Sequence, residues 1–225
     1  MKHAFTAAAA AAALLFGAGS AFAADIPVQK LDPALNAQLP QAIKDAGVIR
    51  NCVIGSFSPY TITRADTTIE GAAMDLTKAL GEVLGVKIET TKIAGHSATM
   101  LGLKSGRYDV SLEPVGDYPD REVNYDFVDY VQEFVVFAVK KGNPHNIRSI
   151  ADTCGLRVSV MAAGSAERVI KKQSEVCVKE GKKPVTVLSF EGQAAPTMAL
   201  SSGRADAFFS SQAPLTRSEE HTSEL

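Results

Sequence analysis

A few polar side chains in this sequence have types that could do chemistry. Arg121 offers a planar guanidinium, whose two parallel donors match a carboxylate. Gly164 and Ser165 lie where a strand is expected to give way to a helix, and free N–H groups at such a turn suit an anion. Glu113 and His96 are the only candidates for a positioned acid or base. Because the chain has no nucleophile motif, no H-E-x-x-H and no phosphate loop, we expect binding rather than catalysis, with no metal and no cofactor.

The predicted strands and helices alternate along the chain. A weak helix at 34–46 comes first, and helical apolar spacing then predicts helices at 72–84, 96–104, 165–179 and 193–202. β-Branched and apolar runs predict strands at 48–55, 86–91, 108–112, 127–140, 156–161, 185–190 and 205–209. This alternation is typical of α/β proteins whose parallel sheets are covered on both faces.

The long predicted strand at 127–140 joins two such blocks. Two blocks joined in this way indicate two lobes with a cleft between them. Ligands of open α/β sheets bind outside the carboxyl ends of the strands, so we expect the polar residues that follow the strands to face this cleft.

The N-terminus is typical of an exported protein. Met1-Lys2-His3 gives a short basic start, an uncharged apolar run covers residues 7–16, and Ala21-Phe22-Ala23 is an A-x-A cleavage signature. We therefore expect residues 1–23 to be a signal peptide and the mature protein to lie in the periplasm. The apolar run is too short for a spanning helix, which needs about 20 residues, and no later segment could span a membrane.

The last nine residues, 217–225, have no apolar periodicity and resemble the translation of a sequencing-library adapter. We expect a non-native tail here and a fold that is incomplete at its C-terminus; the alternative is a natural acidic tail. Leaving out Lys2 and Arg217 takes the basic residues from 23 to 21, and leaving out the tail's three glutamates takes the acidic residues from 25 to 22. The remaining charge of about −1 gives no electrostatic support for nucleic-acid binding.

Five short motifs give the chain a family likeness. They are GAAMDLTKAL with the following LG at 71–85, LKSGRYD at 103–109, PDR and DFVDY at 119–130, AGSAE at 163–167, and LSSGRADA at 200–207. Each resembles, in order, a signature of the family-3 solute-binding proteins, which serve polar amino-acid ABC transporters. The matches run from about residue 48 to residue 212.

The resemblance implies a two-lobed periplasmic binding protein type II fold that closes on its ligand. It places lobe 1 and the first hinge strand at 24–140 and part of lobe 2 at 141–216. The implied function is a receptor that delivers a small, carboxylate-bearing polar solute to ABC transporter permease subunits. The alternatives are a dehydratase-like enzyme of the same fold and a ligand-sensing module.

The resemblance also implies roles for single residues. Arg121 matches the family's arginine that binds the ligand's α-carboxylate; the alternatives are a solvated arginine or one paired with Asp117 or Asp126. Phe57 and Tyr60 match the aromatic wall of the ligand site, with packing in the core of lobe 1 as the alternative. Ser165 serves as a helix N-cap, an anion ligand, or both.

Four positions depart from the family pattern. His96 stands where an apolar or aromatic residue usually faces the ligand, unless it is a surface helix cap. Ser211 replaces the acidic residue that usually holds the α-ammonium, and Gly116 and Tyr118 replace threonines. Because a buried ammonium without a carboxylate is costly, we expect Glu113 to face a positive group of the solute. The alternative is a rim glutamate that balances Arg121.

The predicted elements also bring two of the three cysteines together. Cys154 precedes the strand at 156–161, and Cys177 lies near the end of the helix that follows. The strand rises about 20–25 Å and the helix returns about 18 Å, so both thiols reach a similar level. In an oxidising compartment we expect a Cys154–Cys177 disulfide, with Cys52 free and packed as a small apolar group.

Overall fold

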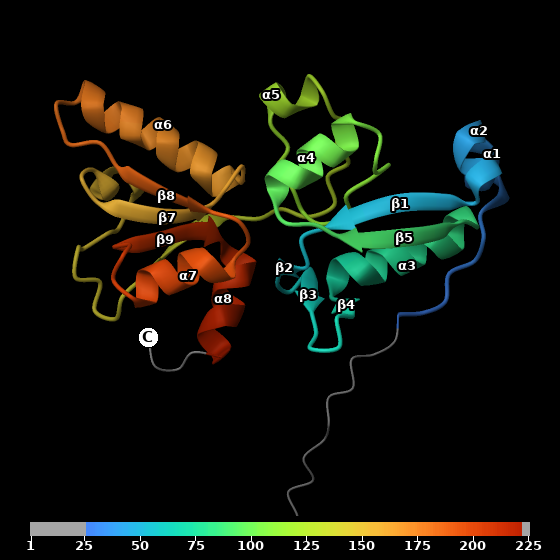
Figure 1. The fold of residues 1–225 in the computed structure, drawn as a ribbon, viewed down its shortest axis with the longest axis horizontal. Coiled ribbons are helices and arrows are strands. Elements are labelled where there is room, and N and C mark those ends of the chain that lie inside the picture. Colours follow the sequence, from blue (N-terminus) through green and yellow to red (C-terminus); the bar gives the residue numbers. More distant parts are fainter. Residues whose placement is uncertain (1–25, 222–225) are drawn as a thin grey trace, which may run out of the picture.

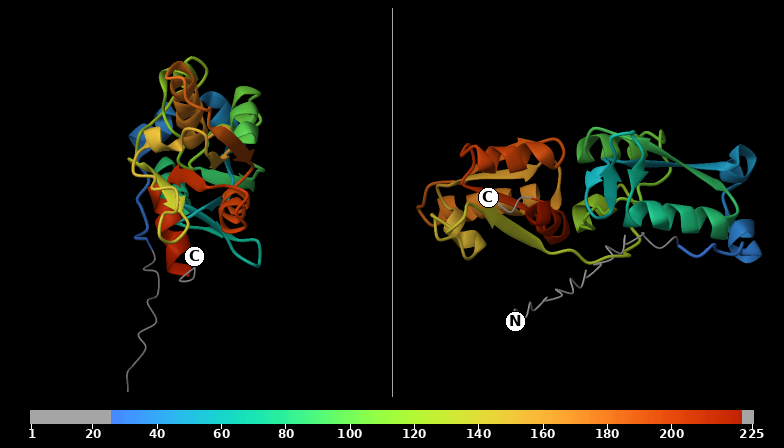
Figure 2. Two further views of the ribbon diagram at one scale, coloured as in Figure 1. Left: turned by 90° about the vertical axis from the view of Figure 1, so that its left-hand side faces the viewer. Right: turned by 90° about the horizontal axis from the view of Figure 1, so that it is seen from below.

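The structure, a computed structural model, describes residues 26–221, with side chains as far as Thr216. The predicted signal peptide, residues 1–23, lies outside the described residues. The described chain forms two α/β lobes side by side (Figures 1 and 2). The first lobe holds two small sheets and the second holds one sheet of four strands. The predicted fold class, an α/β chain in two lobes, is therefore confirmed.

The first lobe is built on a parallel pair of strands with helices on both sides. Strand β1 runs beside β5 in register from Val48 opposite Lys87 to Val53 opposite Lys92. Helix α3 covers one face of this pair and α4 the other (Figure 1). A small antiparallel sheet of β2, β3 and β4 follows β1. The elements of this lobe are α1 (Pro33–Gln38), α2 (Gln41–Ala46), β1 (Val48–Val53), β2 (Ser56–Phe57), β3 (Thr61–Thr63), β4 (Ile69–Glu70), α3 (Ala72–Leu84), β5 (Lys87–Lys92), α4 (His96–Lys104) and α5 (Pro119–Glu122).

The second lobe is a four-stranded sheet in the order β6-β9-β7-β8, with α6 on one face and α7 and α8 on the other (Figure 1). Strand β7 runs parallel to β8 and β9, whereas β6 is antiparallel to β9. Its main core lies between α6 and the sheet and includes Val158, Val160, Ile170 and Phe209. The elements are β6 (Val135–Val139), the 3-10 turn η1 (Ile150–Thr153), β7 (Arg157–Met161), α6 (Ser165–Lys179), β8 (Thr186–Phe190), α7 (Ala194–Ser201), β9 (Ala207–Ser211) and α8 (Gln212–His221).

One predicted strand is absent and another is much shorter than expected. In the segment 108–112 only Val110 pairs, through an isolated parallel bridge to Asn51 of β1. In the long segment 127–140 only Val135–Val139 forms a strand, β6, on the edge of the second sheet. Residues 127–134 run between the lobes, where no strand of the described chain lies alongside to accept their hydrogen bonds. Their β-branched and aromatic composition favours extended backbone, but strand formation needs a partner.

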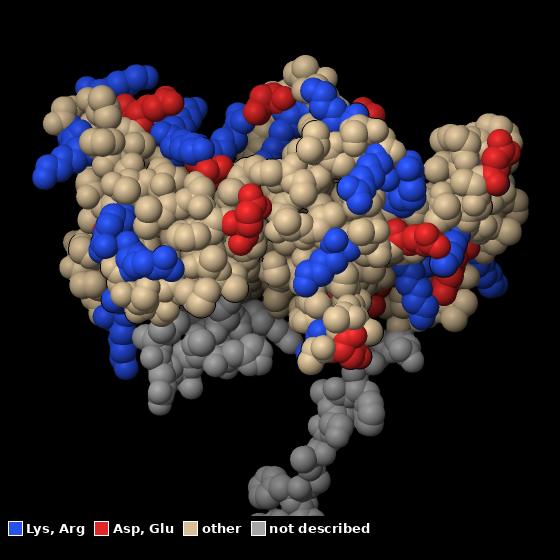
Figure 3. All heavy atoms as spheres, viewed as in Figure 1, with Lys and Arg blue, Asp and Glu red and all other residues tan. Residues whose placement is uncertain are grey.

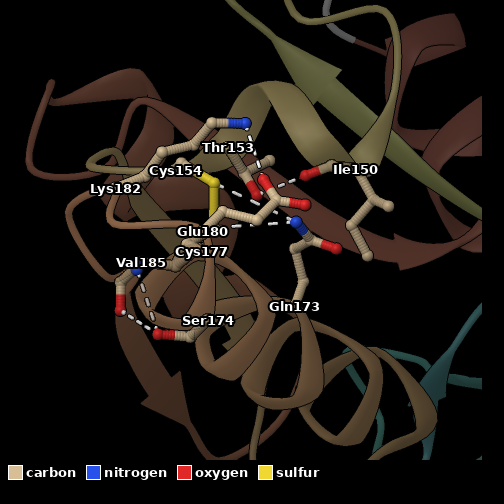
Figure 4. The surroundings of a disulfide bond; sticks show 9 residues. All are labelled: Ile150, Thr153, Cys154, Gln173, Ser174, Cys177, Glu180, Lys182 and Val185. Atoms are coloured by element: carbon tan, nitrogen blue, oxygen red, sulfur yellow. Dashed lines mark hydrogen bonds and ion pairs between the residues drawn. A yellow bond between two sulfur atoms is a disulfide. The ribbon is translucent and has the colours of Figure 1, made fainter.

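The predicted disulfide between Cys154 and Cys177 is present, with 5.6 Å between the Cα atoms. Cys154 follows η1 directly, and Cys177 is buried on the last turns of α6 (Figure 4). Cys52 is free and buried in β1, as expected. The disulfide therefore ties the far end of α6 to the segment that enters β7.

We expect loss of this disulfide to destabilise the protein. Replacing both Cys154 and Cys177 by Ser opens a loop with a sequence separation of 23, for which the chain-entropy model gives about 3 kcal/mol. Urea unfolding of the double variant measures this loss, and Cys52→Ala is the control for a lost buried sulfur outside the loop. Non-reducing peptide mapping should find Cys154 and Cys177 joined. An unchanged free energy of unfolding, or a peptide linked through Cys52, would contradict the prediction.

Candidate functional site

A small cavity of about 180 Å³ lies between the lobes. Both lobes line it, together with residues of the segment that connects them. Six of the eight residues predicted for the site line this cavity: Phe57, His96, Arg121, Gly164, Ser165 and Ser211. Tyr60 and Glu113 do not.

Arg121, in the short helix α5, is half-buried and hydrogen-bonded to both lobes. Its Nη1 donates to the Gly116 carbonyl of the first lobe at 2.6 Å, and its Nη2 donates to the Ala163 carbonyl of the second lobe at 2.7 Å. Partial burial lowers the pKa of the guanidinium, which nevertheless stays charged. These two carbonyls are its hydrogen-bond partners among the described residues, and neither Asp117 nor Asp126 pairs with it. Two of its five N–H donors are used, so donors remain for a solute.

The first turn of α6 faces the cavity from the second lobe. Gly164 is the N-cap and Ser165 the first helical residue, so Ser165 is not the cap that one alternative expected. Just before them, Ala163 has a φ of 56°, a conformation that costs a non-glycine residue about 1–2 kcal/mol. In this conformation its carbonyl accepts from Arg121 and its N–H donates to Glu167 at 2.7 Å. The left-handed turn at Ala163 therefore directs its carbonyl toward the Arg121 guanidinium in the cavity.

Glu167 lies in the first turn of α6 but does not line the cavity. Burial raises the pKa of its carboxyl, but hydrogen bonds from Lys171, Ser189 and the Ala163 N–H outweigh burial and lower that pKa overall. The carboxylate thus fixes the Ala163 turn and leaves the N–H groups of α6 to face the cavity.

His96 begins α4 and is only 6% exposed, so it is not a surface cap. Burial and the charge of Arg121 lower its pKa to about 4, so the imidazole is neutral at pH 7. Its Nδ1 is buried without a hydrogen-bond partner among the described residues. A Cβ built on Gly164 would lie 3.5 Å from its Cδ2, so the first turns of α4 and α6 meet across the cavity.

Gly116 explains one departure from the family pattern. A Cβ at this position would lie 2.4 Å from the Ser165 Oγ and 2.8 Å from the Tyr118 ring. The ring of Tyr118 in turn carries the guanidiniums of Arg121 and Arg168 at 5.3 and 4.9 Å. A threonine at position 116 would collide where the two lobes approach each other.

The aromatic wall is built differently from the expectation. Phe57 lines the cavity, and Tyr60 stacks behind it with ring centroids 5.8 Å apart. The Tyr60 hydroxyl donates to Glu133, and burial together with this hydrogen bond raises its pKa, so the phenol stays protonated. Met161 of the second lobe packs against Phe57 and Ile54 of the first, forming a small apolar contact between the lobes.

Glu113 takes neither of the two places expected for it. It is only 3% exposed, accepts from the Ile54 N–H at 2.5 Å and also accepts from the Thr61 hydroxyl. Its carboxylate therefore braces the turn after β1 inside the first lobe, away from the solute cavity and from Arg121. The prediction that Glu113 faces the cavity was wrong because the path of residues 108–112 does not determine whether the next side chain points into the cavity or into the first lobe.

Glu133 is a cavity-lining residue that the sequence analysis missed. It belongs to the connecting segment, which was expected to be plain strand. Its one sequence signal is that it is one of two acidic residues, with Asp129, in the mostly apolar and β-branched run 127–139.

The surface and the other described residues add little to the site. On the face in Figure 3, basic and acidic side chains occur on both lobes, and neither sign gathers in one patch. Among residues 26–221, no helix is long and apolar enough to cross a membrane. The described part of the chain also holds no cluster of three or more His, Cys, Asp or Glu that could bind a metal.

Comparisons with known proteins agree on one group. Residues 49–199 match the family described as bacterial extracellular solute-binding proteins, family 3. The arginine-binding protein ArgT of Corynebacterium glutamicum is 30% identical over 176 residues, which are 78% of this chain and 57% of ArgT. The chain therefore spans less than two thirds of that relative.

Solved structures of amino-acid-binding proteins share the fold. An ancestral arginine-binding protein bound to arginine is 28% identical, with a TM-score of 0.72 over 79% of this chain and 76% of that one. The ancestral amino-acid-binding protein AncCDT-1, a precursor of cyclohexadienyl dehydratase, is 25% identical, with a TM-score of 0.67 over 76% of this chain and 73% of its own. Holo ArgBP from T. maritima, at 20% identity and a TM-score of 0.71 over 83% of this chain and 78% of its own, shares the fold alone.

The position of Glu113 predicts a pH-dependent effect on stability. Burial raises its pKa above the ordinary 4.5, against the hydrogen bonds that lower it. The folded protein therefore loses stability as pH rises from about 4.5 through the raised pKa, because the carboxyl must ionise inside the lobe. Glu113→Gln, which mimics the protonated acid, should gain stability relative to the parent across this window.

Urea unfolding of parent and Glu113→Gln between pH 4 and pH 8 measures this difference. Glu113→Leu is the matched control: it removes the same ionisable group, so its difference from the parent changes with pH in the same way, but it leaves the Ile54 N–H without its acceptor and should be about 1–3 kcal/mol less stable than Glu113→Gln at every pH. A Gln-minus-parent difference that does not change with pH would contradict the assignment.

Proposed function

Because this chain belongs to the bacterial extracellular solute-binding proteins, family 3, we propose that it binds a free amino acid in the cavity between its lobes and delivers it to an ABC importer. The observation that carries this proposal is the Arg121 guanidinium, which lies in the cavity and is bonded to main-chain carbonyls of both lobes. A solute carboxylate that takes its free donors would join the same two lobes.

The surroundings of Arg121 favour an anionic group at this end of the cavity. The first turn of α6 presents N–H groups at Ser165 and Ala166, which line the cavity together with the N-cap Gly164, whose own N–H donates to the Met161 carbonyl at 3.3 Å. The start of α4 lies opposite, at His96. Two helix N-termini and one guanidinium together stabilise a carboxylate by charge and by hydrogen bonds.

Delivery to permease subunits and a periplasmic location belong to the same proposal. They are supported by the family's extracellular character and by the signal-peptide signature of residues 1–23. Genes for a permease and an ATPase beside the gene of this protein would support delivery; their absence would favour a sensing role.

A dehydratase-like reaction is the weaker candidate. One similar structure is a precursor of such an enzyme, and His96 is an acid–base group that lines the cavity and feels the charge of Arg121. A catalytic base works best with a pKa near the working pH, whereas the pKa of His96 is about 4. The neutral imidazole is better suited to hydrogen bonding than to proton abstraction.

We expect Arg121→Ala to abolish amino-acid binding and to leave the secondary structure unchanged. Removing one partner of a desolvated charge pair costs about 2–5 kcal/mol, or about 30-fold to several-thousand-fold in affinity. Titration calorimetry with a panel of amino acids, alongside far-UV circular dichroism, measures both effects.

Arg121→Lys is the matched variant for this experiment. It keeps the charge but lacks the two parallel donors, so it should recover only part of the affinity. An affinity of Arg121→Ala within about threefold of the parent would show that the guanidinium does not bind the solute.

A further inference from the structure

Glu133 is a carboxylate held in the cavity from both lobes. It is half-buried in the segment that connects them and lies just before β6. Its Oε1 accepts from the Tyr60 hydroxyl of the first lobe, and its Oε2 accepts from the Ala213 N–H at 3.3 Å, in the first turn of α8. These two donors fix the orientation of the carboxylate.

The charge of Glu133 is not balanced by the protein. No lysine or arginine of residues 26–216 forms an ion pair with it, and Arg121 is the one lysine or arginine that lines the cavity within this range. The two groups do not pair with each other, since Arg121 donates to Gly116 and Ala163. A carboxylate has about four acceptor sites, and Tyr60 and Ala213 take only two of them.

The other two carboxylates at the cavity are placed differently. Asp129 is exposed, and both Asp117 and Asp129 raise the pKa of the exposed Glu122 beside them. These three form an acidic group next to α5, in which Asp117 is half-buried and has its Oδ1 buried without a hydrogen-bond partner among the described residues. Among these cavity carboxylates, Glu133 is the one that hydrogen bonds from both lobes hold in a fixed orientation.

We propose that Glu133 binds a side-chain cation of the solute while Arg121 binds the solute's α-carboxylate, so that the preferred solute is an amino acid with a basic side chain. This inference rests on the proposed function and names the solute class of the same cavity. A partly desolvated carboxylate without a cationic partner is costly, and a guanidinium or ammonium relieves that cost by its charge and by hydrogen bonds to the acceptor sites that Tyr60 and Ala213 leave open. A neutral side chain of the same shape would leave the charge unpaired.

The proposed role differs from that of a latch between the lobes. A latch would need only the hydrogen bonds from Tyr60 and Ala213, and its loss would weaken every solute alike. A cation-binding carboxylate distinguishes solutes by charge. The ligand pair that separates the two roles is L-arginine and L-citrulline, which have nearly the same shape but differ by one positive charge.

Titration calorimetry with the full chain tests the inference. The parent should bind L-arginine at least tenfold more tightly than L-citrulline. Glu133→Gln should weaken L-arginine about 10- to 100-fold, as expected for one charged hydrogen-bonded partner, and change L-citrulline by less than threefold. Glu175→Gln, which removes the same charge from an exposed site on α6, should change neither affinity.

Tyr60→Phe completes the experiment, because it removes the donor from the first lobe and keeps the carboxylate. It should affect both solutes equally and preserve the preference for L-arginine. Equal losses for both solutes in Glu133→Gln would show a latch, and no loss would show a bystander; either result overturns the inference. A parent that binds L-citrulline as tightly as L-arginine overturns it while leaving amino-acid binding intact. A parent that binds no amino acid overturns the proposed function and this inference with it.

Discussion

The arrangement of the two lobes depends on one guanidinium and the carbonyls that it contacts. Arg121 is half-buried, and a charge in that position needs acceptors. It finds them in the carbonyls of Gly116 and Ala163, one from each lobe. Several local features follow from this pair of bonds: the missing side chain at Gly116, the left-handed conformation of Ala163, and the Glu167 carboxylate that fixes the Ala163 turn.

The same guanidinium sets the electrostatics of its neighbours. Together with burial, its charge keeps the pKa of His96 near 4, so the imidazole opposite α6 is neutral. The buried Nδ1 of this imidazole has no hydrogen-bond partner among the described residues. A second contact between the lobes, the ion pair of Arg168 with Asp120, is exposed and contributes little by itself. The polar contacts between the lobes are therefore arranged around one charged centre, beside the small apolar contact of Met161 with Phe57 and Ile54.

Local sequence signals predicted four helices well, but the predicted helix at 34–46 is two helices, α1 and α2, separated at Leu39-Pro40, and α5 and α8 were not predicted. The bounds of α3, α4 and α6 agree with the prediction to the residue, because each has a clear apolar spacing and a glycine or lysine at its end. The strand predicted at 108–112 and the 127–134 part of the strand predicted at 127–140 were wrong, because a strand needs a neighbouring strand to hydrogen-bond with, and local composition does not reveal whether one is present. The disulfide was predictable because a strand and the helix after it are connected by a short, definite geometry.

Gly164 and Ser165 were predictable because they come just after a predicted strand, and Arg121 was predicted from the resemblance of its PDR motif to the family. The positions of Glu113 and Glu133 were not predictable, because their hydrogen-bond partners lie in segments that are distant in the sequence. Glu113 turned inward because the Ile54 N–H and the Thr61 hydroxyl needed an acceptor, and both come from a turn about 50–60 residues away. Glu133 was missed because its partners, Tyr60 and Ala213, belong to different lobes and neither is near it in sequence.

The small apolar contact between Met161, Phe57 and Ile54 has a consequence for how the lobes move. The larger apolar cores lie within the second lobe, so separating the lobes would hydrate only a few apolar side chains. If the lobes separate, this apolar term contributes little to the free-energy difference between the two arrangements, and a solute that favours the closed one by a few kcal/mol would shift the population toward it. Solute binding should accordingly show a heat-capacity change far smaller than that of folding, since little apolar surface leaves water when the lobes close.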